Sequence, residues 1–451
     1  MSRRRRPRLP EEILEAEIDS LSHDGRGVGR VDGKTVFVRD ALPGEHVRFR
    51  LTRRKKNFDE GVLAELLRSA PDRVEPGCAH FGVCGGCSLQ HLDRAAQVAH
   101  KQRGLVEALE HIGKVEPDVL AEPLVSEPWG YRRKARLGAK FVRKHERVFA
   151  GFRERGTSFV TDVRECRVLH PRVGPRVGDL ADMIGSLSIR DKVPQVEMAM
   201  GDDLCAMVFR VLAPPTEEDR ARIAAFCSAH NWVPCIQEGG PDSVRALDGS
   251  ALEIHYSLPE QGVHFTFLPT DFTQVNLEMN RRMVTQALDW LSPGEGERIL
   301  DLFCGLGNFS LPVARKCEAV VGVEGDNALV ARARRNAEDN AIHNARFYTA
   351  NLYGELDAEP WMRERFDAVL LDPPRSGAAE MVSLMPKLGA GRILYVSCYP
   401  GTLARDAGIL VNEHGYRLVR AGIMDMFPHT AHVESMACLL YTSDAADDLY
   451  N

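Results

Sequence analysis

The sequence predicts an α/β protein in three parts: an N-terminal β-barrel, a central α+β part and a C-terminal Rossmann-like parallel sheet. Short runs of alternating apolar and polar residues fill positions 11–68. Period-two patterning with frequent turns is typical of a small barrel. From about residue 263, strand-like and helix-like segments alternate, as a parallel α/β sheet requires. The 451 residues suffice for about three domains, which we place at 10–69, 70–262 and 263–451.

The composition is that of an ordinary globular protein, with 44% hydrophobic and 27% charged residues. Neither a secretory leader nor a membrane-length apolar stretch is recognisable, so we expect a cytoplasmic protein with no membrane partner. Eleven cysteines in such a chain indicate thiols, metal ligands or nucleophiles rather than a disulfide framework. The net charge is −6, but residues 1–58 and 129–172 carry 15 and 13 Lys/Arg against 9 and 4 Asp/Glu. Such segregation indicates a nucleic-acid-binding surface.

The first 69 residues hold the predicted barrel. Turns such as Asp32-Gly33 and Pro43-Gly44 separate its strands, and Arg53-Arg54-Lys55-Lys56 forms a basic loop. Gly25-Arg26-Gly27-Val28-Gly29 is not a dinucleotide fingerprint, because no helix-forming segment follows and the third glycine is misplaced. We interpret it as a hairpin loop. OB-like barrels with basic loops commonly bind RNA.

The central part opens with a cysteine cluster. Cys78, Cys84 and Cys87 form a C-x5-C-x2-C pattern whose glycines allow a tight loop, and Cys166 is the best candidate for a fourth ligand. Four thiolates suit either a [4Fe–4S] cluster or a structural zinc ion. The spacing differs from the CxxxCxxC pattern of radical enzymes, so a cluster here would be structural or would organise RNA contacts. Buried cysteines without a metal are the alternative.

Basic strands follow the cluster. Residues 129–155 mix cations with aromatics, as in Trp129-Gly130-Tyr131-Arg132-Arg133-Lys134 and Phe152-Arg153-Glu154-Arg155. Cations can contact phosphates while aromatics stack on unpaired bases. A solvated strand face with its aromatics turned into the core explains the same pattern. The neighbouring cysteine cluster favours RNA binding.

A nucleoside cofactor site is predicted at the start of the C-terminal sheet. Residues 298–310, RILDLFCGLGNFS, form a strand, a glycine turn and the start of a helix. The glycines permit positive φ and close approach of a ligand. The next strand ends at Glu324, where a carboxylate can bind ribose hydroxyls, and Asn351 follows a later strand, within reach of an adenine. A dinucleotide would require a third glycine, so S-adenosylmethionine fits better.

Two further strands bring an acid and a thiol to the same sheet edge. One ends in Asp372-Pro373-Pro374-Arg375, where amino-methyltransferases carry an aromatic residue in place of Arg375, and the next delivers Cys398. Uracil C5 is a poor nucleophile, but thiolate attack at C6 gives an enolate that accepts a methyl group at C5, after which a base removes the C5 proton. We expect Cys398 to be that nucleophile and Glu434 to be the base. The target uracil would be flipped out of its stack.

Together these motifs resemble the RNA uracil-C5 methyltransferase family (TrmA/RlmC/RlmD), and the resemblance covers nearly the whole chain. It rests on DLFCGLGNF at 301–309, DPPR at 372–375, Ser397-Cys398 and HVE at 432–434. The resemblance implies a class I methyltransferase domain, a TRAM barrel, Cys398 as nucleophile and Glu434 as base. It implies a cofactor site for S-adenosylmethionine made of Gln274, Phe303, Asn308, Glu324, Asn351 and Asp372. It also implies a [4Fe–4S] cluster held by Cys78, Cys84, Cys87 and Cys166.

Accessory parts separate the branches of this family. The tRNA-modifying branch has neither barrel nor cluster and a second branch has the cluster alone, so a chain with both resembles the RlmD branch, which acts on 23S rRNA. We therefore expect 23S rRNA as the partner, presenting a single-stranded or flipped-out uridine, and no obligate protein partner. A tRNA uracil-C5 methyltransferase and a non-catalytic iron–sulfur RNA-binding protein are the alternatives.

Two segments depart from the family pattern. Tyr399-Pro400 follows Cys398, where Asn-Pro is usual, which alters the hydrogen bonding beside the nucleophile. The ending from Cys438 to Asn451 is acidic, where apolar and then basic residues are usual. Our hypothesis is that this ending is foreign or out-of-frame sequence, which would leave the edge strand after Glu434 poorly anchored.

Overall fold

The computed structural model describes residues 12–442. The first basic run and residues 443–451 of the acidic ending lie outside this range. Contacts divide the chain into two compact units. The first runs to Lys101 and includes Arg153–Ser158 and Phe427–His432, and the second contains the remaining segments. No helix between residues 12 and 442 is long and apolar enough to cross a membrane.

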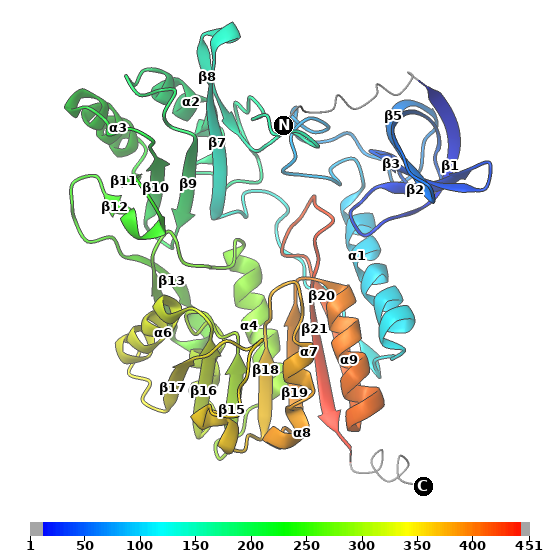
Figure 1. Ribbon diagram of the computed structural model, residues 1–451, viewed down its shortest axis with the longest axis vertical. Helices are drawn as coiled ribbons and strands as arrows, with labels where there is room; N and C mark the ends of the chain where they lie inside the picture. Colours follow the sequence, from blue (N-terminus) through cyan, green and yellow to red (C-terminus); the bar gives the residue numbers. More distant parts are fainter. Residues whose placement is uncertain (1–11, 443–451) are drawn as a thin grey trace. The chain divides into compact units, whose positions relative to one another are not determined.

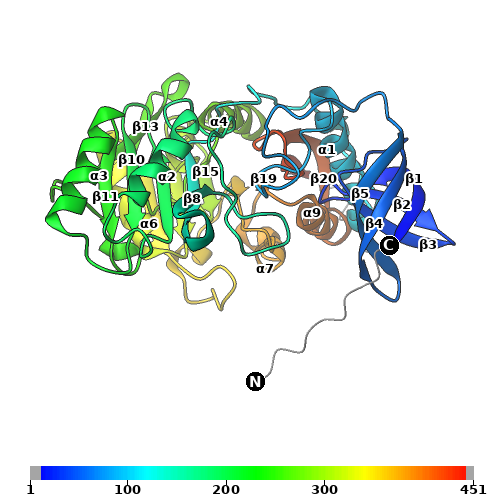
Figure 2. The ribbon, with the colours of Figure 1, turned by 90° about the horizontal axis from the view of Figure 1, so that it is seen from above.

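The first unit contains the predicted barrel, which is closed and whose strands are seen in Figures 1 and 2. β3 and β5 are parallel, and the other neighbouring strands are antiparallel. Alternate side chains point inward and form a core that includes Val36, Val38 and Phe49. Gly61 is required where β5 crosses this core, because a Cβ atom there would lie 2.3 Å from the Phe49 ring. In barrel order the strands are β1 (Ile13–Leu21), β2 (Gly27–Val31), β3 (Lys34–Arg39), β5 (Phe58–Arg68) and β4 (His46–Arg54).

A loop at 69–93, which carries three of the four predicted metal ligands, connects the barrel to α1 (Arg94–Ala108). The fully buried carboxylate of Glu45 anchors the start of this loop. It accepts hydrogen bonds from the Leu42 N–H at 2.8 Å and from Arg73 Nη2 at 2.9 Å. Because a buried charge is costly unless it is paired, the Glu45–Arg73 pair ties the loop to the barrel.

The second unit contains a six-stranded sheet in the order β12-β11-β10-β9-β7-β8. β10 and β11 are parallel, and the other neighbours are antiparallel. Two mutually contacting helices, α2 (Val177–Gly185) and α3 (Glu217–Ala229), pack against β8 and β11. The strands are β7 (Lys134–Val142), β8 (Arg147–Gly151), β9 (Gln195–Met200), β10 (Cys205–Arg210), β11 (Val233–Gln237) and β12 (Arg245–Ala246).

An eight-stranded sheet in the order β17-β16-β15-β18-β19-β21-β20-β6 forms the rest of the second unit, with helices along it (Figure 1). The five strands from β17 to β19 are parallel, as predicted. From β15 the chain adds β16 and then β17 on one side. It then returns to the other side of β15 and adds β18 and β19. Such a switch point is where open α/β sheets bind ligands, outside the carboxyl ends of the strands.

The elements of this region alternate along the chain. A hairpin of β13 (Ile254–Leu258) and β14 (Val263–Phe267) precedes all of them except β6. The strands are β6 (Val119–Leu120), β15 (Arg298–Leu302), β16 (Ala319–Glu324), β17 (Ala345–Thr349), β18 (Ala368–Leu371), β19 (Arg392–Ser397), β20 (Tyr416–Met424) and β21 (Glu434–Tyr441). The helices are α4 (Leu277–Leu291), α5 (Ser310–Ala314), α6 (Asn327–Asp339), α7 (Ala379–Val382), α8 (Met385–Leu388) and α9 (Pro400–His414).

β21 is an interior strand and not the poorly anchored edge strand that we expected. It lies antiparallel between β19 and β20 and bonds to both. Cys438 and Leu439, the first residues of the unusual ending, are buried within it. A strand buried on both faces can be apolar along its length, and residues 436–440 fit that pattern. The rest of the ending, beyond residue 442, lies outside the described residues.

Candidate active site

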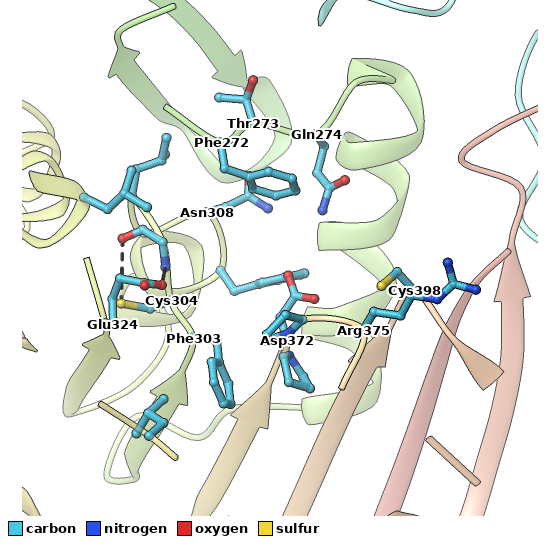
Figure 3. A pocket seen from close by; sticks show the side chains of 18 of the residues that line it. Phe272, Thr273, Gln274, Phe303, Cys304, Asn308, Glu324, Asp372, Arg375 and Cys398 are labelled. Carbon is cyan, nitrogen blue, oxygen red and sulfur yellow. Dashed lines mark hydrogen bonds between the residues drawn. The ribbon is translucent and has the colours of Figure 1, made fainter. Parts of the chain in front are cut away.

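A cavity of about 570 Å³ lies at the carboxyl ends of β15, β16, β18 and β19 (Figure 3). In Figure 3, Cys398 and Arg375 lie at one end of it and Glu324 at the other. Every residue predicted for cofactor binding or catalysis lines this one cavity. They are Gln274, Phe303, Asn308, Glu324, Asn351, Asp372, Cys398 and Glu434.

The turn after β15 has the backbone conformation that the glycines predict. Gly305 and Gly307 have φ of +55° and +92°. Phe303 also has a positive φ, +65°, which is unusual for an aromatic residue. Its N–H donates to the Val323 carbonyl at 2.8 Å, which secures this conformation. The turn thereby directs the Phe303 ring into the cavity, where it meets the Tyr353 ring at 5.7 Å between centroids.

Glu324 ends β16 with both carboxylate oxygens engaged. Oε2 accepts the Gly305 N–H at 3.1 Å, and Oε1 accepts the Asp326 N–H at 3.1 Å. Two main-chain donors from different segments therefore fix the carboxylate at the wall of the cavity. The arrangement suits recognition of a diol, because a fixed carboxylate can still accept hydrogen bonds through its remaining lone pairs.

The two predicted asparagines are held mainly by the protein itself. The amide of Asn308 pairs head to tail with that of Asn280, with both hydrogen bonds at 3.0 Å, and accepts the Tyr256 hydroxyl at 2.9 Å. The side-chain oxygen of Asn351 accepts the Tyr353 N–H at 3.1 Å. Both therefore position the walls of the cavity.

The end of the cavity near Cys398 is acidic and poorly solvated. Burial, with a smaller effect of Glu324, raises the pKa of Asp372 to about 7. Burial, with a smaller effect of Asp372, raises the pKa of Glu434 to about 8. Burial and then the Glu434 and Asp372 carboxylates raise the pKa of the Cys398 thiol to about 11. A positive charge placed here would therefore be stabilised.

Phe272 and Tyr353 are two exposed aromatic residues of the cavity that were not predicted from the sequence. Phe272 is 67% exposed, and Tyr353 is 42% exposed. A large exposed ring on a cavity wall is a ready stacking surface for a base. Phe272 stands two residues before Gln274. The family resemblance therefore identified this segment as part of the site but did not single out the Phe272 ring.

The cysteine-rich loop of the first unit is shaped by main-chain bonds. The Cys84 N–H donates to the His80 carbonyl at 2.9 Å, and the Gly86 N–H points to Cys84 Sγ at 3.4 Å. An N–H directed at sulfur suits a thiolate that binds a metal. Cys166 lies in the second unit, where its N–H bonds the Gly174 carbonyl at 2.9 Å. Across residues 12–442, no three His, Cys, Asp or Glu side chains are arranged to hold a metal ion.

Several cations of the basic segment stabilise the protein itself. Arg155 pairs with Asp40, lies over the Phe81 ring at 4.5 Å and donates to the Cys84 carbonyl at 3.2 Å. Arg133 donates to the Gly201 carbonyl at 2.7 Å, and Lys134 donates to the Asp271 carbonyl. These cations are engaged with protein groups. Arg136, Lys140 and Lys144 are exposed.

Comparison with known proteins decides the family. A family model described as tRNA (Uracil-5-)-methyltransferase matches residues 246–442, and the TRAM domain model matches residues 7–64. A 23S rRNA (uracil(1939)-C(5))-methyltransferase RlmD from Alkalilimnicola ehrlichii is 53% identical, covering 96% of this chain and 98% of that one. The chain belongs to the RlmD group of RNA uracil-C5 methyltransferases. An RlmD protein from Nitrosococcus oceani is 52% identical, with coverages of 96% and 97%.

A solved structure extends the comparison beyond the RlmD group. The Pyrococcus abyssi tRNA (uracil-54, C5)-methyltransferase, in complex with S-adenosyl-L-homocysteine, superposes with a TM-score of 0.72 at 25% identity. The match covers 95% of this chain and 100% of that one, so it extends into the N-terminal barrel. Our expectation that tRNA-modifying members lack the barrel is therefore wrong for this enzyme. Sequence identity, and not domain content, places the chain with RlmD.

Proposed function

We propose that this chain methylates C5 of a uracil in 23S rRNA with S-adenosylmethionine as the methyl donor. The 23S rRNA methyltransferases among its relatives support the substrate, at up to 53% identity over 96% of the chain. The observation that carries the chemistry is that one cavity gathers Cys398, Glu434 and Asp372 with the glycine turn and Glu324. The TRAM barrel and exposed cations such as Lys140 and Lys144 would bind the rRNA, and the reaction would take place in the cytoplasm.

The lining of the cavity fits the cofactor. S-adenosylmethionine would supply a methyl group from a sulfonium cation, and an end lined by Asp372 and Glu434, both with raised pKa values, suits a cation. Glu324 would bind the ribose hydroxyls. Gln274, Phe303, Asn308 and Asn351 would complete the site.

Cys398 acts as the nucleophile in this proposal. Because its thiol pKa is raised to about 11, the thiol is protonated at neutral pH, and it loses its proton to solvent water as it attacks. The sulfur adds to C6 of the uracil, and the electron pair of the C5–C6 double bond moves into the enolate. After C5 has been methylated, the Glu434 carboxylate removes the C5 proton. The electron pair of that C–H bond restores the double bond and expels the Cys398 thiolate.

The test uses a 23S rRNA fragment containing 5-fluorouracil. Fluorine replaces the C5 proton that Glu434 must remove, so the covalent adduct should persist in a denaturing gel. Cys398→Ala should abolish the adduct and the incorporation of labelled methyl groups. Cys317→Ala, which removes a buried thiol outside the cavity, should retain both. A full-strength adduct with Cys398→Ala would refute the assignment of the nucleophile.

A tRNA substrate is the second candidate, because the Pyrococcus abyssi relative of similar fold is a tRNA methyltransferase. Undermodified 23S rRNA and tRNA should be offered together at equal uridine concentrations. We expect methyl groups in the rRNA. Methyl groups found in tRNA alone would reverse the substrate assignment, and no methyl transfer to either RNA would favour a non-catalytic RNA-binding protein.

We also propose that Cys78, Cys84, Cys87 and Cys166 hold a [4Fe–4S] cluster. Three thiols in one short glycine-rich loop and the N–H directed at Cys84 Sγ support it. Iron and sulfide analysis should give about four of each per chain. Cys166→Ser should lower the iron content, whereas Cys227→Ser, at a buried cysteine of α3, should not. Zinc without iron would show that these cysteines hold a structural zinc ion instead of a cluster.

A further inference from the structure

A second cavity, of about 290 Å³, opens on the six-stranded sheet of the second unit. Four neighbouring strands, β7, β9, β10 and β11, contribute to its floor. Its walls come from the loop after β11 and from Pro269-Thr270. The floor residues are Arg136, Gln195, Glu197, Val208, Arg210 and Gln237.

Strand alternation explains why this floor is polar. In β9, Val196 and Met198 are buried on one face, while Gln195 and Glu197 line the cavity on the other. In β10, Phe209 is fully buried while Arg210 is exposed. A sheet with one face packed and the other polar is an arrangement that some RNA-binding domains use to present unpaired nucleotides to solvent-facing side chains.

The charges in the cavity do not cancel. Arg136 Nη2 pairs with Glu197 Oε2 at 3.2 Å, so these two side chains compensate each other. Arg210 forms no ion pair or side-chain hydrogen bond with any residue between 12 and 442. The cavity therefore carries one uncompensated positive charge among amide and carboxylate groups. This combination suits a phosphate together with the polar edge of a base.

A short fixed segment joins the two cavities. Thr270 lines the second cavity and Phe272 lines the first, and an extended chain spans at most about 7 Å between them. Asp271 is buried and anchors the segment. Its carboxylate pairs with Arg332 at 2.6 Å and accepts the Leu268 N–H at 2.8 Å. When the target uracil of an RNA strand occupies the first cavity, a nearby nucleotide of the same strand can therefore reach the second cavity.

We propose that this second cavity is a subsite for one unpaired RNA nucleotide close to the target uridine. Arg210 binds its phosphate, and Gln195, Gln237 and Glu197 contact the edge of its base. The volume is at the small end of the range for ligand sites, about 300 Å³, which suits a single base better than a larger ligand. This inference rests on the proposed RNA methyltransferase function, and it adds a determinant of substrate choice outside the catalytic cavity.

The test measures methylation kinetics of Arg210→Ala and Gln237→Ala with a 23S rRNA fragment. We expect the KM for RNA to rise about 10-fold for Arg210→Ala, with kcat at saturating RNA and the KM for the cofactor unchanged. Loss of one phosphate contact should also lower the salt dependence of RNA binding by about one unit of slope. Arg222→Ala is the matched control, since Arg222 belongs to α3, away from the cavity lining.

An abasic scan then locates the nucleotide. In the wild-type protein, an abasic residue at one position near the target should weaken binding, and the same change should cost little in Gln237→Ala. Equal abasic profiles for wild type and variant, or an unchanged KM for Arg210→Ala, would overturn the subsite while leaving the methyltransferase function intact. Failure of the wild-type protein to methylate any RNA would overturn the proposed function and the subsite with it.

Discussion

The guanidinium carbon of Arg375 lies 4.7 Å from the centroid of the Tyr399 ring. Arg375 follows β18 and lines the cavity, and Tyr399 immediately follows Cys398. The charge of Arg375 lowers the pKa of the Cys398 thiol, against the larger upward effects of burial and of the neighbouring carboxylates. Tyr399, which stands where the family usually has Asn, thus holds a cation beside the proposed nucleophile.

Replacing Tyr399 should weaken catalysis by releasing this cation. A cation–π contact at a partly exposed site contributes about 0.5–1 kcal/mol, so Tyr399→Ala should lower kcat about 2- to 5-fold at neutral pH. Tyr399→Phe keeps the ring and should keep the activity. Equal losses in both variants would show that the hydroxyl, and not the ring, matters.

The rate should follow the ionisation of Glu434. Only its carboxylate can accept the C5 proton, and its pKa is raised to about 8, so kcat/KM should rise with pH through about 8. Glu434→Gln should lower kcat by about 10²- to 10⁴-fold and remove this limb of the profile. It should also let methylated RNA accumulate as a covalent adduct, visible in a denaturing gel. Rapid turnover by Glu434→Gln would identify a different base.

The stability of the protein should fall as the pH rises from about 4 to 8. Burial raises the pKa of Asp301 and Asp372 to about 7 and of Glu434 to about 8, from ordinary values of 3.8 and 4.5. These three groups bind more protons in the folded state in this window. They outnumber His91 and His170, whose pKa values burial lowers to about 3 and about 4, so the unfolding free energy decreases with pH. Urea denaturation at several pH values checks this. The glutamine of the Glu434→Gln variant is neutral at every pH. This variant should therefore show a flatter dependence of the unfolding free energy on pH near pH 8.

Glu324→Gln should weaken cofactor binding. The substitution keeps the shape but removes the charge that two main-chain N–H groups hold in place. Hydrogen bonds to charged groups contribute about 1.5–3 kcal/mol, so the Kd for S-adenosylmethionine should rise about 10- to 100-fold in calorimetry. Glu318→Gln, at an exposed acid just before β16, is the control. An unchanged Kd for Glu324→Gln would remove Glu324 from the cofactor site.

Arg155→Ala should destabilise the cysteine-rich loop. Arg155 is 10% exposed and connects Asp40, the Phe81 ring and the carbonyls of Cys84 and Cys87. Removing Arg155 leaves Asp40 with only the longer contact to Arg39 at 3.9 Å, and we expect a loss of about 2 kcal/mol in chemical denaturation. Arg153→Ala changes an exposed neighbour and should be close to neutral. Equal effects of both variants would contradict this role.

Much of the architecture follows from local pattern. Alternation at 11–68 predicted a closed barrel, because a short strand with period-two patterning has to bury one face. The strand–turn–helix at 298–310 predicted a glycine turn with positive φ, because few other residues adopt that conformation without strain. Since parallel strands present their carboxyl ends at one edge, the residues following β15, β16, β18 and β19 were expected to share a site.

Other features depended on contacts between residues far apart in sequence. Whether β21 is an edge or an interior strand is decided by its pairing with both β19 and β20, which its own residues do not encode. Whether Arg155 binds RNA or the protein is decided by Asp40 and Phe81, which are distant in the chain. The sequence by itself determined the strands and the turns, and it predicted the roles of Cys398 and Glu434 that we propose. Tertiary structure alone decided which groups are buried, and burial raises the pKa values of the acids in the active-site cavity. It also decided the partners of each cation and formed the polar cavity beside Thr270, because these features depend on which surfaces meet.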